Sequence, residues 1–241
     1  MQFLSEKLSL KKLTGAHKKR FLKILIFLMA TVLGFLGFWF ALRVALNTEC
    51  PIMPVSLGSM CVFQPNCDDL THPFDPTLHV GDLIIIQGVD ARSVRDAYPD
   101  SDVLVFSFPK GDAYQDSGLT ITRVITKEER NDVIYFRTKG DGEGVHIWPE
   151  MPDVSECDRW YDYRENYTRN GMISEKLLVG KVVFRIPWIG YIALFMQTSA
   201  GISLIVVLII IMLIVEFAIP AFISKKAETK PKKSEENASD T

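Results

Sequence analysis

The chain has 241 residues, a formal net charge of −2 at pH 7 and 48% hydrophobic residues. This length permits one or two domains, and the composition is close to that of a globular protein. The charge is unevenly placed, because residues 48–199 carry 23 acidic and 14 basic side chains, whereas basic residues gather near both ends. The acidic middle segment argues against a nucleic acid as the partner.

An uncharged apolar run of 19 residues, Ile24–Leu42, lies near the N-terminus. At 1.5 Å per residue, a helix of this length spans a bilayer core of about 30 Å. The run is longer than the apolar part of a signal peptide, and no clear cleavage site of small residues follows it. We therefore expect a retained transmembrane helix over residues 24–47, after a basic N-terminus over residues 1–23.

A second apolar run, Ile202–Val215, continues past Glu216 to Ile223. A carboxylate costs roughly 3 kcal/mol at the middle of a bilayer. Snorkelling toward the interface, or a helix partner, could accommodate Glu216. We expect a second transmembrane helix over residues 200–223 and a charged, disordered tail over residues 224–241.

Lysines and arginines precede the first apolar run, and lysines follow the second. Because cytoplasmic segments carry an excess of basic residues, both termini are predicted to lie in the cytoplasm. The expected localisation is a multi-pass protein of the plasma membrane, with residues 48–199 outside it.

The outer segment is long enough to bury a core of its own. Short β-branched runs, some alternating with period two, are separated by turn residues; they cover residues 82–90, 102–108, 119–127, 131–139 and 177–186. The third and fourth runs indicate a hairpin. We predict a mostly β fold, with an antiparallel β outer domain flanked by two transmembrane α-helices.

All four cysteines fall in the outer segment, at Cys50, Cys61, Cys67 and Cys157. An even number of cysteines outside the cytoplasm permits two disulfides, with three possible pairings. A Cys61–Cys67 bridge would close a small loop, and four free thiols are the alternative. Zinc binding by these cysteines is disfavoured because no Cys-x-x-Cys pair occurs. Asn166 begins a glycosylation sequon.

Several short motifs follow one another along the outer segment. Alone, the serine of Gly58-Ser59-Met60 would be typical of a turn. The later motifs are His79-Val-Gly-Asp-Leu-Ile-Ile85, Arg123-Val-Ile125, Thr138-Lys-Gly-Asp141, Val179-Gly-Lys-Val-Val183 and Arg185-Ile-Pro-Trp-Ile-Gly190. In this order the chain resembles the signal peptidase I family, in its archaeal and endoplasmic-reticulum-type branch. The resemblance covers roughly residues 51–195.

The resemblance implies a membrane-tethered, mostly β serine endopeptidase that removes signal peptides from secretory precursors. It implies that Ser59 is the nucleophile and that Asp141 supports catalysis. The expected partners are precursor proteins bearing signal peptides, the lipid bilayer and the secretion machinery. Neither a cofactor nor a metal is expected.

The sequence departs from the family pattern at three places. The base of the family stands directly before the arginine-valine pair, where this chain has Thr122. A threonine hydroxyl cannot accept a proton usefully near pH 7, so Thr122 cannot activate Ser59 as a base. The position of a serine that helps bind the oxyanion is Leu57, with Ser56 beside it. Glycine and glutamate follow Asp141 where asparagines are frequent.

Another side chain could take the place of the base. His146 is the preferred candidate because its loop also carries Asp141, and His79 is a second one. Lys139 is a third, since burial lowers the pKa of a lysine. His17 lies on the cytoplasmic side and is excluded. Each candidate also has a structural interpretation.

Three functions therefore stay open. The first is a signal-peptide-removing serine endopeptidase. The second is a catalytically weakened relative that binds precursor peptides or serves as a subunit of a processing complex. Loss of one member of a serine triad still leaves roughly 10³–10⁴-fold catalysis over water, and recognition by strand addition needs no base. The third is a structural outer domain between two anchors.

Overall fold

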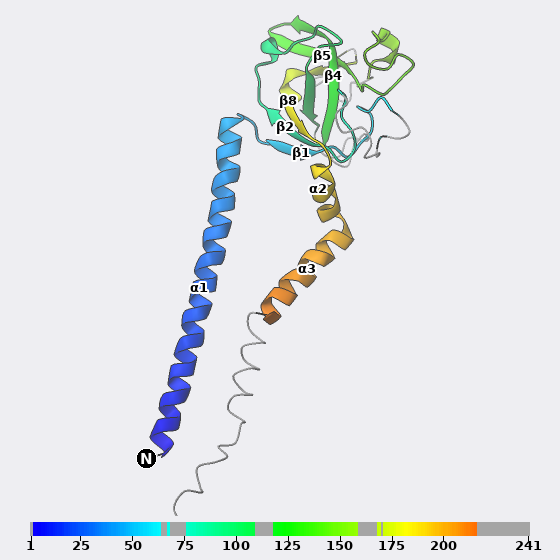
Figure 1. The fold of residues 1–241 in the computed structure, drawn as a ribbon. Coiled ribbons are helices and arrows are strands. Elements are labelled where there is room, and N and C mark those ends of the chain that lie inside the picture. The colour runs from blue at the N-terminus through cyan, green and yellow to red at the C-terminus, as the bar shows by residue number, and fades with distance from the viewer. Residues whose placement is uncertain are drawn as a thin grey trace, which may run out of the picture.

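The computed structural model describes residues 2–63, 67, 76–108, 118–158, 168–169 and 171–215. Its helices are α1 (Gln2–Ala45), α2 (Ile189–Gln197) and α3 (Ser199–Leu213). Its strands are β1 (Ile52–Pro54), β2 (Leu83–Gln87), β3 (Val103–Ser107), β4 (Leu119–Arg130), β5 (Val133–Lys139), β6 (Thr168–Arg169), β7 (Met172–Ser174) and β8 (Leu178–Ile186). They form one antiparallel sheet in the order β1-β2-β8-β3-β4-β5-β7-β6. The prediction of a mostly antiparallel β domain is confirmed (Figure 1).

The predicted hairpin is formed by β4 and β5, which pair from Arg123↔Lys139 to Arg130↔Val133. Its turn residues, Asn131 and Asp132, have φ angles of 53° and 60°. Two consecutive positive φ angles match the right-handed twist of the flanking strands, and asparagine and aspartate tolerate them well. The turn chemistry thus fixes the register near the turn, and an irregularity between Val124 and Thr126 shifts it before the strand ends meet at Arg123↔Lys139.

The sheet has a buried cluster on each face. Along β3, Leu104 and Phe106 enter the cluster that contains Val124 and Phe136, whereas Val105 enters the other. This alternation follows from the period of two along a strand. Met60, the residue after Ser59, belongs to the second cluster and is 1% exposed. The candidate nucleophile is therefore anchored to the core by its neighbour.

The last strand, β8, lies between β2 and β3. It pairs with β2 from Leu83↔Ile186 to Gln87↔Lys181 and with β3 from Leu104↔Lys181 to Phe106↔Leu178. The N-terminal strands β1 and β2 are consequently joined to the rest of the sheet through β8.

The N-terminal helix α1 is continuous from Gln2 to Ala45, so the basic N-terminus and the apolar run form one helix. Its segment Leu25–Ala45 is long and apolar enough to cross a membrane, with a mean hydropathy of 2.3 and none of that window buried. The helix projects away from the sheet (Figure 1). It ends two residues before the predicted end of the span at residue 47.

Helix α3 begins at Ser199, one residue before the predicted start of the second span, and the short helix α2 precedes it. Helices α2 and α3 meet at an angle of 87°. At the break, the Thr198 hydroxyl accepts a hydrogen bond from the Gly201 N–H at 3.1 Å and so caps α3. The pair is long and apolar enough for a span only when both helices count together. Residues 216–223 of the predicted span, and the predicted tail over residues 224–241, lie outside the described residues.

Helix α2 is packed tightly onto the sheet at Gly190. A Cβ atom at this position would lie 2.3 Å from the Asp82 carbonyl oxygen, so only glycine permits the close approach. Because Asp82 directly precedes β2, the start of α2 has a defined place against the β domain.

Cys61 and Cys67 form a disulfide, as one of the possible pairings predicted. Cys50 and Cys157 are both free, so a second disulfide is not formed. Asn166, the acceptor of the predicted sequon, lies outside the described residues.

Candidate functional site

Ser59 lies in a turn after β1 and is half-buried. The Cys61 N–H donates to the Gly58 carbonyl at 3.0 Å and closes this turn. A Cβ at Gly58 would lie 3.4 Å from the Cβ of Cys67, so the Cys61–Cys67 disulfide packs directly against it. Core packing of Met60 on one side and the disulfide on the other hold the backbone of Ser59.

The turn of Ser59 contacts the loop that follows β5. The Gly142 N–H donates to the Ser59 carbonyl at 3.0 Å. A Cβ at Gly140 would lie 2.6 Å from the same carbonyl oxygen, so the two backbones meet because residue 140 is glycine. The structure thus brings the predicted nucleophile next to the loop of Asp141. The role of Ser59 in catalysis stays a prediction.

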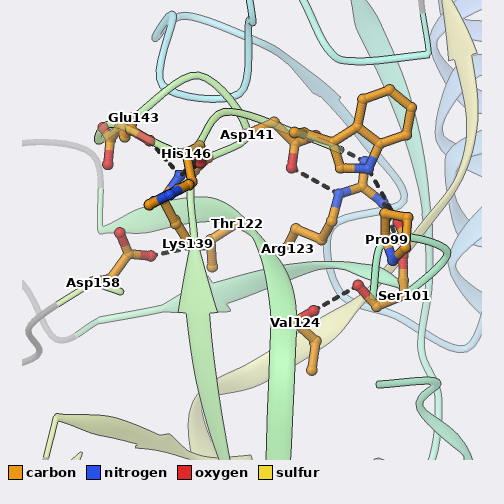
Figure 2. A network of polar contacts seen from close by, with 12 residues as sticks. Pro99, Ser101, Thr122, Arg123, Val124, Lys139, Asp141, Glu143, His146 and Asp158 are labelled. Atoms are coloured by element: carbon orange, nitrogen blue, oxygen red, sulfur yellow. Dashed lines mark hydrogen bonds and ion pairs between the residues drawn. The ribbon is translucent and has the colours of Figure 1, made fainter. Parts of the chain in front are cut away.

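Asp141 is buried and paired with an arginine from β4. Arg123 donates from Nε to Asp141 Oδ1 at 2.7 Å and from Nη2 to Oδ2 at 2.8 Å. The two side chains are 9% and 1% exposed. Burial raises the pKa of Asp141, and the hydrogen bonds and charge of Arg123 oppose this rise. The Asp141 carboxylate therefore acts as an anchor for its loop (Figure 2).

Further contacts hold the Arg123 guanidinium. It donates to the Ser101 carbonyl at 2.9 Å. The Trp148 ring lies against it, with 5.5 Å between the Arg123 Cζ and the ring centroid, a cation–π contact. The Trp148 indole donates to the Pro99 carbonyl at 3.1 Å, and its backbone N–H donates to the Asp141 carbonyl at 2.8 Å. Asp141, Arg123 and Trp148 thus form one buried unit.

Thr122, where the resemblance would place a base, is 1% exposed. Its hydroxyl donates to Asp158 Oδ2 at 2.8 Å, and the Thr138 hydroxyl donates to the same oxygen at 3.0 Å. Burial raises the pKa of Asp158, whereas the hydrogen bonds from Thr122, Thr138 and the Gly140 backbone lower it. A half-buried carboxylate that the sequence analysis did not predict therefore lies beside Thr122 (Figure 2).

Lys139 is 2% exposed and points toward the loop after β5. Its ammonium group donates to the carbonyls of Gly140 at 3.4 Å, of Glu143, and of His146 at 2.9 Å. An ammonium group has three donors and no acceptor, so this arrangement uses all of them. These contacts indicate a positioning role for Lys139 rather than that of a proton acceptor.

His146 is held by a carboxylate from the same loop. Its Nδ1 lies 2.8 Å from Glu156 Oε1, and its backbone N–H donates to Glu156 Oε2 at 3.1 Å. The hydrogen bond and charge of Glu156 raise the pKa of His146. The imidazole is half-exposed, so it remains accessible from solvent.

His79 belongs to a different cluster, beside β2. It is 4% exposed, its backbone N–H donates to Asp82 Oδ2 at 2.8 Å, and its ring centroid lies 6.0 Å from that of Phe63. Asp82 also pairs with Arg185 at 3.3 Å. These contacts match the structural interpretation of His79. Leu57, where the resemblance would place a serine that helps bind the oxyanion, is 54% exposed.

The sequence predicted that Ser59 and Asp141 belong to one site. It did not predict that Asp158 and Glu156 lie in the same loop region as partners of Thr122 and His146. Both carboxylates stand outside the family motifs. The loop from residue 141 to residue 158 carries several carboxylates, and no local spacing marks which of them turn inward. A search of protein-family models finds none that matches this chain, and a search of curated proteins finds no significant match.

Proposed function

We propose that the chain is a membrane-anchored serine endopeptidase of the signal peptidase I type, which removes signal peptides from secretory precursors. The observation that carries the proposal is the backbone contact between Ser59 and Gly142. It joins two motifs that are distant in the sequence, and hydrolysis by a serine needs its supporting groups around one place. Ser59 is the nucleophile of this proposal.

His146 is the base of the proposed reaction. In serine triads a carboxylate holds Nδ1 of the histidine, which fixes the tautomer, while Nε2 takes the proton of the nucleophile. The 2.8 Å contact between His146 Nδ1 and Glu156 supplies such a carboxylate. The start of the loop that carries this pair contacts the Ser59 carbonyl through Gly140 and Gly142.

The proposed protein is anchored twice in the plasma membrane, with both termini in the cytoplasm and the β domain outside. Helix α1 and the α2–α3 pair leave the β domain at the same end, which supports insertion of both into a single bilayer (Figure 1). The lysines around residues 7–23 and 225–233 support the orientation.

A second candidate is a weakened relative that binds precursor peptides, alone or within a secretion or processing complex. Thr122 favours this second candidate. Its hydroxyl is buried and hydrogen-bonded to Asp158, so it cannot accept the proton of Ser59 as the family's base would. Among the described strands, β1 pairs with β2 alone and ends a few residues before Ser59. Such an edge can accept an extended peptide by strand addition.

The test is cleavage of a labelled precursor by the full chain in proteoliposomes. The endopeptidase proposal predicts a processed product that disappears with Ser59→Ala and persists with the matched control Ser93→Ala. It also predicts a large loss with His146→Ala. Cleavage that survives Ser59→Ala would overturn the proposal.

The same assay separates the second candidate. No cleavage by the wild-type chain, with cleavage gained by Thr122→His, would favour the weakened relative. Photo-crosslinking of the precursor to the β domain would then be expected, because binding does not need the base. Absence of both cleavage and crosslinking would leave only a structural role.

A further inference from the structure

We propose that His146, Asp153 and Glu156 bind a divalent transition-metal ion of the zinc class. Each residue offers one ligand atom, and the three atoms all lie within 4.8 Å of one another. One imidazole and two carboxylates are a donor set that zinc sites use in proteins. We call these three residues the outer corner of the loop over residues 141–158.

The local backbone explains why the two carboxylates meet. Residues Val154–Glu156 form one turn of 3₁₀-helix, and Asp153 stands at its N-cap. Side chains three residues apart in such a turn lie above one another, so Asp153 and Glu156 share one side. The Asp153 side chain makes no capping hydrogen bond, although aspartate is a favourable cap. Its carboxylate is instead directed toward the other two ligands.

His146 precedes this turn in the loop, and both its backbone N–H and its backbone carbonyl are held by hydrogen bonds. The His146 N–H donates to Glu156 Oε2 at 3.1 Å, and its carbonyl accepts from Lys139 Nζ at 2.9 Å. A ligand held by its own backbone needs little reordering to bind an ion. The 2.8 Å contact between His146 Nδ1 and Glu156 Oε1 shows that these two ligand atoms already converge.

The donor chemistry selects among metal ions. Oxygen ligands alone suit Mg²⁺ and Ca²⁺, whereas an imidazole favours zinc and its first-row neighbours. Ligand bonds of about 2.0–2.2 Å require donor atoms roughly 3–3.5 Å apart around a tetrahedral ion, so small side-chain rotations complete the site. Asp153 is exposed and His146 and Glu156 are half-buried, which gives an ion access from solvent.

The metal proposal goes beyond the proposed peptidase and stands independently of it, because binding is measured without any precursor. A bound ion would engage His146 and Glu156, the pair that the peptidase proposal assigns to proton transfer. Occupied chains would then lose that proton acceptor, so cleavage would fall while metal binding remained measurable.

The experiment titrates the purified, tag-free full chain in detergent with Co²⁺ after removal of metals by a chelator. We expect about one equivalent to bind with the visible absorption of a low-symmetry Co²⁺ site, and Zn²⁺ to displace it. His146→Ala, Asp153→Asn and Glu156→Gln should each weaken binding by at least about tenfold. Glu150→Gln, in the same loop but outside the corner, is the matched control and should bind like wild type.

Cys157 is a second, informative control because it is a free cysteine next to Glu156. The Cys157→Ser variant should bind Co²⁺ like wild type. Loss of binding with Cys157→Ser, equal weakening by Glu150→Gln, or no Co²⁺ bound by the wild-type chain would each overturn the proposal. Asp153 is exposed, so Asp153→Asn tests the site without disturbing the fold, and its melting curve verifies this.

Discussion

The loop over residues 141–158 has two regions that use charge in opposite ways. We call the start of the loop, Gly140 and Asp141 with the partner Arg123, the root. There the Asp141 side chain is 1% exposed and bound through both oxygens to Arg123. At the outer corner, the His146 and Glu156 side chains are 40% and 15% exposed and share a single contact between side chains. A buried side chain whose charge is already paired is shielded from solvent. A charged side chain at the surface can exchange a proton with water or bind a metal ion. We therefore expect the root to position the loop and the outer corner to carry the proposed chemistry.

Breaking the root should have the largest effect on stability. Arg123→Met leaves the Asp141 carboxylate buried without its partner, which should cost about 3–5 kcal/mol of unfolding free energy. Urea unfolding of the β domain in detergent measures the loss. Replacing Asp141 as well, in Arg123→Met with Asp141→Leu, should recover most of it. A control is Arg92→Met, whose ion pair with Glu129 is exposed and should contribute little.

Separating the root from Ser59 should have the next largest effect. Gly140→Ala places a Cβ 2.6 Å from the Ser59 carbonyl, so one backbone must move, at a cost of about 1–3 kcal/mol. The rate of precursor cleavage should fall by more than the loss of folded protein accounts for, because the Ser59 turn and the Asp141 loop shift relative to each other. Gly37→Ala is the control, since nothing lies within 4 Å of its Cβ position. Equal effects of both changes would contradict the proposed contact.

Removing one donor to Asp158 tests whether this carboxylate belongs to the root. Thr122→Val keeps the shape of the side chain but deletes the 2.8 Å hydrogen bond to Asp158. Loss of this hydrogen bond leaves the Asp158 carboxylate with one donor fewer, which should cost about 1–3 kcal/mol of unfolding free energy. Thr126→Val, on the exposed side of the same strand, is the matched control. Unchanged unfolding of Thr122→Val would place Asp158 in the accessible part of the loop instead.

The smallest effect is expected at Tyr98, beside the root. Burial and the negative charge of Asp141 raise the pKa of Tyr98 from 10.0 to about 12. The folded protein therefore holds this proton more tightly than the unfolded chain, so stability should be lost as pH rises between these values. In Tyr98→Phe, unfolding free energy should decline less steeply over that interval. Identical slopes in both proteins would show that the fold does not raise the pKa of Tyr98.

The sequence predicted the long strands of the sheet but not its shortest ones. Runs of β-branched residues marked β2, β3, β4, β5 and β8, because such side chains fit a buried pleated surface. The strands β1, β6 and β7 have two or three residues, which is too short for an alternation to be recognised. The bend between α2 and α3 at Thr198 lies two residues before the predicted start of the second span, so it leaves the apolar run of α3 continuous.

For the candidate site, the order of the motifs along the chain predicted which residues lie near one another, but not which side chains form hydrogen bonds or ion pairs. The motifs placed Ser59 and Asp141 together, and the backbone contact through Gly142 agrees. The partner of Asp141 could not be read from spacing, because Arg123 reaches it across two adjacent strands. Likewise, Glu156 meets His146 only because the chain turns back at residues 154–156.

The position of β8 within the sheet has a consequence for how the protein is made. Among the described strands, β1 and β2, which precede and follow the turn of Ser59, are joined within the sheet to β4 and β5 only through β8 and β3. A chain emerging from the ribosome can form the β4–β5 hairpin early, because those contacts are local. The two halves of the candidate site must wait until residues 178–186 have been synthesised. A chain that stops before β8 would therefore contain every proposed catalytic residue and still lack the site.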